Sequence, residues 1–333
     1  MSKILVIGDV HCKRSNLSEI RLFKDRLALC IEQSKPEHIV FLGDNLDKHD
    51  VLYTVCLNLM NDIIHMCREK SQVYLIVGNH DMIGPTEFLN DNHWLNSHKE
   101  WENVEVIDRV RTMNLSDIVC TFVPYVENGR FMEALNTNSH WQNSNIIFCH
   151  QEFKGCKMGA ITSETGDEWP VDSIQIISGH IHSKQQPQDN IYYTGSALQH
   201  AFGESSDTTL LLIDGIDNYQ EIDLDLPKKK IIYAKSDEIE NIEFKNDNYK
   251  VVVSGSVSEY KQFVKSKKYK KMINDGIKIT FKNTKKEIKD QNELIKSLNN
   301  EKTNFEDILG KLVDKENDEI LNVDYKKYIL NNK

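Results

Sequence analysis

The amino-acid sequence predicts a globular α/β protein, in which a sandwich of β-sheets flanked by helices is followed by a small second α/β domain. Three observations carry this prediction. Short apolar runs alternate with longer amphipathic ones over the first 80 residues, apolar runs dominate after about residue 103, and the net charge changes sign near Pro227.

The first 80 residues have the order expected of β-α-β units. Apolar runs at 3–8, 38–42 and 72–77 predict strands, and residues 17–34 and 50–69 between them carry helical spacing. The later apolar runs predict further strands at 104–107, 117–123, 145–149, 174–178, 191–194 and 208–213. We therefore expect a sheet sandwich with helices on its outer faces.

The chain divides near Pro227. Residues 1–227 hold 17 Lys and Arg against 33 Asp and Glu, whereas residues 228–333 hold 24 Lys and Arg against 18 Asp and Glu. Such asymmetry predicts modules with different partners, although a lysine-rich surface that only faces water explains it equally well. The expected parts are a first domain at 1–226, a small α/β domain at 227–283 and a helical tail at 284–333. Within the second part we expect a strand at 249–254, a helix at 257–273 and a strand at 277–281.

The composition also limits the compartment. No run approaches the roughly 20 apolar residues of a membrane span, and the apolar N-terminus meets Asp9 too early for a signal peptide. Seven scattered cysteines without a Cys-x-x-Cys pair predict free thiols. We therefore expect an intracellular protein with no membrane partner, in the cytoplasm or nucleoid, or in the host cell if the chain is viral.

Polar residues follow five of the predicted strands directly. The five blocks are Gly8-Asp9-Val10-His11, Gly43-Asp44-Asn45-Leu46-Asp47, Gly78-Asn79-His80-Asp81, Cys149-His150-Gln151 and Ser178-Gly179-His180-Ile181-His182. Because ligands bind at the carboxyl ends of strands in open α/β sheets, these blocks are expected to form one shared site.

Their residue types indicate a metal site. Oxygen donors from Asp and Asn combined with imidazole suit a transition-metal pair better than calcium. Two metal ions about 3.5–4 Å apart can activate water and hold both the attacking and the leaving oxygen of a phosphoryl displacement, and one carboxylate must then bridge them. Alone, Asp9 would be read as a turn residue and His150 as a structural histidine; the five ordered blocks together favour the site.

These blocks resemble, in order, those of the calcineurin-like metallophosphoesterase superfamily: Asp-x-His, Gly-Asp-x-x-Asp, Gly-Asn-His-Asp, a lone His and Gly-His-x-His. The resemblance implies a four-layer α/β/β/α sandwich and two divalent ions, most readily Mn²⁺, with Fe or Zn as alternatives. It also implies roles by motif position: Asp9, His11 and His182 for one metal, Asn79, His150 and His180 for the other, Asp44 as the bridge, and His80 as the catalytic acid, oriented by Asp81.

Three further features resemble the SbcD family of double-strand-break repair nucleases, including its phage recombination versions. They are Gln151 after His150, the segment Tyr193-Thr194-Gly195-Ser196 with the later Gly203-Glu204, and the small second domain, which is similar to a DNA-contacting capping domain. Two features depart from that family: Asn45-Leu46 stands where an apolar pair is more usual, and the polar segment 155–169 has no interpretation.

The helix expected in the second domain is rich in lysine. It carries Lys261, Lys265, Lys267, Lys268, Lys270 and Lys271. The resemblance implies that Lys261, Lys265, Lys267 and Lys268 contact the DNA backbone, which lysine neutralises without reading sequence; a solvated helix face is the alternative. Two amphipathic stretches in the tail would grip an SbcC-like ATPase, or else fold back on their own domain.

We therefore predict a manganese-dependent DNA exonuclease and endonuclease of an SbcCD-type complex, working as a homodimer with an SbcC-like ATPase. The alternative is a small-molecule or nucleotide phosphodiesterase, or a protein phosphatase, of the same superfamily. A binding module that only retains the fold would have no need of the intact ligand set.

Overall fold

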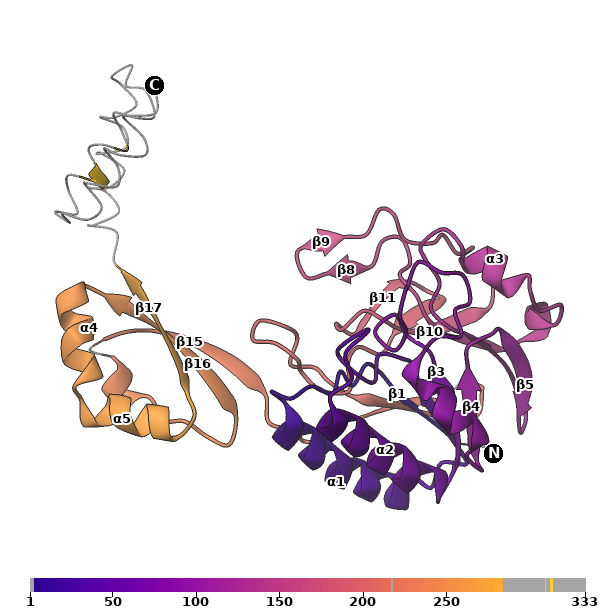
Figure 1. The fold of residues 1–333 in the computed structure, drawn as a ribbon, viewed down its shortest axis with the longest axis horizontal. Helices are drawn as coiled ribbons and strands as arrows, with labels where there is room; N and C mark the ends of the chain where they lie inside the picture. The colour runs from indigo at the N-terminus through magenta and orange to yellow at the C-terminus, as the bar shows by residue number, and fades with distance from the viewer. Residues whose placement is uncertain (1–2, 217, 237, 284–308, 310–311, 314–333) are drawn as a thin grey trace. The chain divides into compact units, whose positions relative to one another are not determined.

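The computed structural model describes residues 3–216, 218–236, 238–283, 309 and 312–313. The chain separates into two compact units, the first formed by residues up to 230 with 245–248, the second by residues 231–244 and those after 248. Figure 1 shows the ribbon of each unit. The tail expected at 284–333 lies outside the described residues, apart from the three named above.

The first sheet of unit 1 has six strands in the order β14-β13-β1-β2-β3-β4. Strands β1 to β4 run parallel, and β13 and β14 run antiparallel to their neighbours. The bounds are β1 Lys3–Ile7, β2 His38–Phe41, β3 Gln72–Ile76, β4 Val104–Ile107, β13 Leu210–Asp214 and β14 Tyr219–Ile222. The crossover helices are α1 (Leu17–Ser34) and α2 (Thr54–Arg68), which lie side by side (Figure 1).

The second sheet of unit 1 also has six strands, in the order β11-β12-β10-β7-β6-β5. Strands β6, β7, β10 and β12 are parallel, and the two edge strands are antiparallel to their neighbours. The bounds are β5 Arg111–Leu115, β6 Ile118–Val123, β7 Ile146–His150, β10 Gln175–Gly179, β11 Gln185–Gln188 and β12 Ile191–Tyr193.

Alternation along each strand divides the core into layers. Ile4 and Val6 of β1 join Phe148 and Ile177 of the second sheet in the buried cluster between the sheets. Leu5 and Ile7, the alternate residues of β1, pack instead in a cluster with α1 and α2. A third cluster covers the far face of the second sheet with the short helix α3 (Phe131–Leu135), Trp141 and Trp169. The predicted α/β/β/α architecture is confirmed.

Unit 2 has a three-stranded sheet in the order β15-β16-β17 with its own core. Its elements are β15 Lys229–Lys235, β16 Asn248–Gly255, α4 Val257–Val264, α5 Lys267–Asn274 and β17 Lys278–Asn283. The prediction of a single helix at 257–273 is wrong, because the helix is interrupted at Ser266. That side chain accepts a hydrogen bond from the Tyr269 N–H and thereby begins α5 as an N-cap.

The remaining elements are short. They are the two-stranded hairpin of β8 (Lys157–Met158) and β9 (Ile161–Thr162), and the 3₁₀ helices Trp94–Glu100, Trp141–Asn143 and Ile239–Asn241. None of the described helices is long and apolar enough to cross a membrane. All seven cysteines lie in the described part, and they are buried and free of disulfides.

Candidate metal centre

Five strand ends converge on one edge of the sandwich in unit 1. Residues after β1, β2 and β3 come from the first sheet, and those at the ends of β7 and β10 come from the second. Glycines allow this close approach. A Cβ at Gly43 would lie 2.6 Å from His150 Nδ1, and a Cβ at Gly78 would collide with the Asp44 carboxylate.

Three residues of this edge have backbone conformations that side chains rarely adopt. The φ angles are 44° at His11, 51° at Asp44 and 76° at His180. Left-handed backbone at residues other than glycine is unfavourable and tends to occur at functional sites. The packing of the two sheets therefore holds these side chains in place against local strain.

One group of possible ligands consists of Asp9, His11 and His182, with one ligand atom from each within 4.8 Å of the others. His182 Nε2 lies 3.1 Å from His11 Nε2. Asp9 is fully buried; its Oδ1 accepts the His180 backbone N–H at 2.9 Å, and its Oδ2 has no hydrogen-bond partner among the described residues. The sequence predicted these three residues as ligands of one metal ion.

A second group consists of Asp44, His150 and His180, again within 4.8 Å of one another. Asn79 joins it, because its Oδ1 lies 3.0 Å from His150 Nε2 and 2.9 Å from His180 Nδ1. These are the residues predicted for the other metal, together with the predicted bridge.

Asp44 lies between the two groups. Its Oδ2 is 3.5 Å from His11 Nε2 in the first group and 3.2 Å from His150 Nε2 in the second. Its Oδ1 accepts a hydrogen bond from the His80 backbone N–H at 2.8 Å. One carboxylate oxygen is therefore within reach of ligands from both groups, as a bridging carboxylate requires.

The donor set fits two divalent cations. Imidazole nitrogens that bind one ion at about 2.0–2.1 Å lie about 3 Å apart. The facing nitrogens are 3.1 Å apart in the His11–His182 pair and 3.3 Å in the His150–His180 pair. The unpaired Asp9 Oδ2 supplies an oxygen donor that burial would otherwise leave unsatisfied. The mixture of carboxylate, amide and imidazole donors suits Mn, Fe or Zn.

Electrostatic interactions couple the carboxylates and imidazoles of the two groups. Burial raises the pKa of Asp44, but the charges of His150 and His11 hold it well below its usual range. Burial lowers the pKa of His150, yet Asp44 and Asp9 raise it to about 9. Burial and the neighbouring His150 charge lower the pKa of His180 to about 3. Buried carboxylates in such a cluster require compensating positive charge.

His80, the predicted catalytic acid, lies beside the first group. Its ring contacts the His11 ring edge-on with centroids 4.8 Å apart, and its Nδ1 is 2.9 Å from the Asp47 carbonyl oxygen. A carbonyl can only accept, so Nδ1 carries the proton of the neutral ring and Nε2 remains for other partners.

The expectation that Asp81 orients the His80 ring needs correction. Asp81 Oδ1 accepts the Asn45 backbone N–H at 3.1 Å and the Trp94 Nε1–H at 2.8 Å, and its Oδ2 accepts the Gly78 N–H at 3.1 Å. Burial and the charge of Asp44 raise the pKa of Asp81 to about 6. Asp81 thus holds the strand-end loops together, and the Asp47 carbonyl orients His80.

Sequence reasoning missed three residues of the site. His49 Nδ1 lies 2.7 Å from the Asn79 carbonyl oxygen, and its ring stacks on His80. His200 Nε2 lies 3.2 Å from the Asp9 carbonyl oxygen, with its ring 5.0 Å from that of His11. No motif marks either histidine. The third is Glu204, whose Gly203-Glu204 block was noted without a role.

Glu204 supports His182 from outside the cluster. Its Oε1 is 3.5 Å from His182 Nδ1, and its Oε2 accepts the backbone N–H groups of His200 and Ala201 at 2.8 Å each. Burial raises the pKa of Glu204, but these hydrogen bonds lower it to about 2. A carboxylate on the far nitrogen of a ligand histidine fixes its tautomer and orientation.

The uninterpreted segment 155–169 forms a wall beside the site. Its β8–β9 hairpin borders a cavity of about 900 Å³ that is also lined by His180, His182 and Phe202. Asp167 anchors the segment by accepting the Gln151 Nε2–H at 2.8 Å and the Phe131 backbone N–H at 3.2 Å. Gln151, which carried the family resemblance, is thus a fully buried structural link.

The predicted DNA-contacting lysines lie in unit 2, on α4, its C-cap and α5. Lys261, Lys265 and Lys267 are exposed. Lys268 is partly buried, and its Nζ donates to the backbone carbonyl oxygens of Ile242 at 2.8 Å and Glu240 at 3.2 Å. The first three are available to a ligand, whereas Lys268 is occupied within its own unit.

Comparison with known proteins gives three sets of matches. The family described as calcineurin-like phosphoesterase matches residues 2–255. The 078R protein of Invertebrate iridescent virus 3 is 40% identical over 290 residues, which cover 84% of this chain and 84% of the relative. The 244L protein of Invertebrate iridescent virus 6 is 43% identical over 281 residues, covering 80% of this chain and 98% of the relative. Both are named phosphoesterases on a provisional basis.

Among solved structures, the phosphoesterase YfcE from E. coli aligns with a TM-score of 0.33 and 12% identity, over 67% of this chain and 93% of its own. GAP50, the anchor in the inner membrane complex of Plasmodium, aligns with a TM-score of 0.41 and 12% identity, over 67% of this chain and 88% of the GAP50 chain.

Proposed function

The chain belongs to the calcineurin-like phosphoesterase family, and from this premise we propose that it is a two-metal phosphodiester hydrolase that cleaves DNA. The observation that carries the hydrolase proposal is the position of Asp44, whose Oδ2 reaches His11 at 3.5 Å and His150 at 3.2 Å. An acid between two ligand groups is the arrangement that a two-metal phosphoesterase needs.

The residues divide the chemistry between them. Asp9, His11 and His182 would hold one divalent ion, and Asn79, His150 and His180 would hold the other. Asp44 would bind both ions. The proposed metal is Mn²⁺, with Fe or Zn as alternatives. When bound, such a pair lowers the pKa of water and neutralises phosphate charge. His80, held at Nδ1 by the Asp47 carbonyl, would donate a proton or a hydrogen bond from Nε2 to the leaving oxygen when both ring nitrogens are protonated.

The DNA part of the proposal rests on unit 2. Lys261, Lys265 and Lys267 are exposed on α4, its C-cap and α5, and lysine neutralises backbone phosphates regardless of sequence. By the same analogy we propose a homodimer that works with an SbcC-like ATPase. The C-terminal segment proposed to grip that ATPase lies outside the described residues.

One observation favours the alternative, a phosphodiesterase for small molecules or nucleotides. The cavity of about 900 Å³ beside His180 and His182 is walled by Met158 and Phe202, and a cavity of this size accommodates a small ligand.

A cleavage assay decides between these substrates. The full chain is loaded with Mn²⁺ and offered linear duplex DNA, single-stranded DNA and bis(p-nitrophenyl) phosphate in parallel, with Asp44→Asn as the inactive control. We expect all three to be cleaved by the wild type and none by the variant. Cleavage of the small diester alone would move the assignment to the small-molecule phosphodiesterase, and cleavage by Asp44→Asn would overturn the two-metal mechanism.

A further inference from the structure

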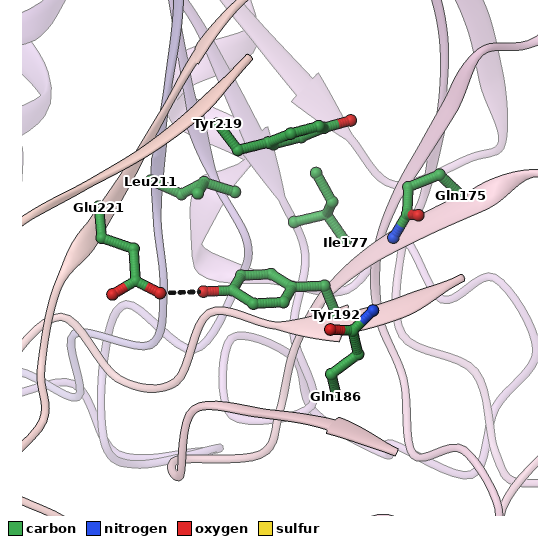
Figure 2. Close-up of a pocket in the computed structure, with 7 residues that line it drawn as sticks. All are labelled: Gln175, Ile177, Gln186, Tyr192, Leu211, Tyr219 and Glu221. Carbon is green, nitrogen blue, oxygen red and sulfur yellow. Dashed lines mark hydrogen bonds between the residues drawn. The ribbon is translucent and has the colours of Figure 1, made fainter. Parts of the chain in front are cut away.

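A second cavity of about 320 Å³ opens in unit 1, away from the metal centre, between the two sheets. It is lined by Gln175, Ile177, Gln186, Tyr192, Leu211, Tyr219 and Glu221, which come from β10, β11 and β12 of one sheet and β13 and β14 of the other (Figure 2). Gln175 and Ile177 stand on β10, whose far end leads to His180. At about 3.3 Å per residue, Gln175 is about 17 Å from that ligand.

The floor of the cavity is apolar. Ile177 and Leu211 are 1% and 3% exposed and belong to the core between the sheets, so they form a rigid floor. Figure 2 shows the rings of Tyr219 and Tyr192 on opposite sides of these two side chains. Tyr219 is 42% exposed, so it is accessible from solvent at the mouth of the cavity. Two aromatic walls over an aliphatic floor suit a planar ring.

The polar groups of the cavity are held in fixed orientations. Gln175 Nε2 donates to the Ile176 carbonyl oxygen at 3.0 Å and Gln186 Nε2 to that of Asp189 at 2.7 Å, and the Oε1 atom of each amide can accept from a further donor. Glu221 accepts the Tyr192 hydroxyl at 2.8 Å and the Lys184 Nζ at 2.5 Å. Both carboxylate oxygens retain a lone pair for a further donor.

These groups also define which ligands are excluded. Glu221 is the single charged side chain among the seven lining residues; its charge is paired with Lys184, and its oxygens can only accept hydrogen bonds, so it offers no donor to phosphate or another anion. A purely aliphatic ligand would leave the amide and carboxylate oxygens without donors. The remaining class is a planar, uncharged ring that carries N–H donors on its edge.

We propose that this cavity binds a nucleobase, inserted between Tyr192 and Tyr219 with its N–H edge toward Glu221 and the glutamine oxygens. The ligand class is a nucleoside or an unpaired base of a longer strand, with its phosphates outside the cavity. The distance to His180 separates this site from the phosphate-binding metal centre. The inference does not depend on the proposed nuclease activity.

The test uses nucleosides, which lack phosphate, and the full chain stripped of metal by a chelator. Calorimetric titration with guanosine, adenosine, cytidine and thymidine is expected to give saturable binding, tightest for the bases with most N–H donors. Tyr219→Ala should weaken this binding about 5- to 150-fold, the range for loss of one base-stacking ring. Leu211→Trp, which fills the cavity, should abolish it.

Tyr233→Ala is the matched control, because it removes a tyrosine that is 75% exposed in unit 2 and should leave the affinity unchanged. Hydrolysis of bis(p-nitrophenyl) phosphate by the metal-loaded variants reports that each is folded. Three results would overturn the proposal: no saturable binding by millimolar nucleoside, binding unaffected by Tyr219→Ala, or binding that requires metal and is displaced by inorganic phosphate.

Discussion

The imidazole ring of His49 stacks on that of His80, with ring centroids 4.2 Å apart and an interplanar angle of 25°. Both rings are tied to backbone carbonyls, His49 Nδ1 to Asn79 at 2.7 Å and His80 Nδ1 to Asp47 at 2.9 Å. The plane of the proposed catalytic ring is therefore set by the loop that follows β2.

Removal of the stacked ring is expected to slow the reaction without affecting the metals. Because such ring pairs contribute about 0.5–1.5 kcal/mol, His49→Ala should lower kcat about 2- to 10-fold with little change in KM. His49→Phe retains a ring and should stay close to wild type. The measurement is steady-state hydrolysis of bis(p-nitrophenyl) phosphate with metal content determined on the same samples.

His80→Ala provides the reference for that series. Loss of a general acid typically lowers the rate about 10²- to 10⁴-fold, so we expect a loss in this range with both metals still bound. Undiminished Mn²⁺-dependent cleavage by His80→Ala would remove His80 from the mechanism, and with it the proposed function of the His49 stack.

Replacement of the proposed bridge should disrupt metal binding. Asp44→Asn removes the negative charge shared by the two ligand groups, so we expect fewer than two metal ions per chain. Mn²⁺ at 100 times its Kd should stabilise the wild type by about 2.7 kcal/mol for each ion bound, and the resulting rise in Tm should be smaller in the variant. Asp62→Asn, which neutralises an exposed acid on α2, is the matched control; two bound ions in Asp44→Asn would contradict the bridge.

The buried His98 is expected to make the fold sensitive to acid. It is fully buried with Nε2 3.0 Å from Asn61 Oδ1, and burial lowers the pKa of His98 from 6.5 to about 4. At a pH between these two values, the His98 imidazole is protonated in the unfolded chain and neutral in the folded chain. The free energy of unfolding should therefore fall as pH drops from about 6.5 toward 4, and be independent of this group above that range.

Urea unfolding at several pH values checks this expectation, with chelator present so that metal binding does not contribute. His98→Gln, which can keep the hydrogen bond to Asn61 but cannot titrate, should show a shallower fall than the wild type. His65→Gln replaces a half-exposed histidine and should follow the wild type. Parallel pH profiles of wild type and His98→Gln would show that another group is responsible.

The exposed lysines of unit 2 are expected to control the salt dependence of DNA binding. Each phosphate contact contributes about 0.9 to the slope of log K against log salt, so replacing Lys261, Lys265 and Lys267 with Gln should reduce the slope by about 2.7. Lys268→Gln should leave the slope unchanged, because its Nζ already binds the Ile242 carbonyl. Equal slopes for the triple variant and the wild type would assign these lysines to a solvated face.

The fold was predictable where burial determines the sequence pattern. Strands of the first sheet are continuous apolar runs because both faces are covered, so the predicted 72–77 differs from β3 by one residue. The edge strand β14 was not predicted, because its residues are largely exposed and show no apolar run. Ser266 splits the expected helix by a local hydrogen bond that helical periodicity does not reveal.

The candidate site was predictable where motifs follow strands. All seven predicted ligands converge, because strand ends fix their positions. His49 and His200 could not be found in this way, since each reaches the site through an irregular loop whose path depends on tertiary packing. The partners of Asp81 were mispredicted for the same reason: adjacency to His80 in sequence does not determine where the carboxylate turns.

The division of the ligands between two sheets bears on the order of folding. His11 and His182 face each other at 3.1 Å although 171 residues separate them, and His180 lies 101 residues from Asn79. A chain still being synthesised cannot assemble this pocket before β10 has docked. Ions held by these residues would therefore bind only after the two sheets have joined through their common core, and would not nucleate either sheet.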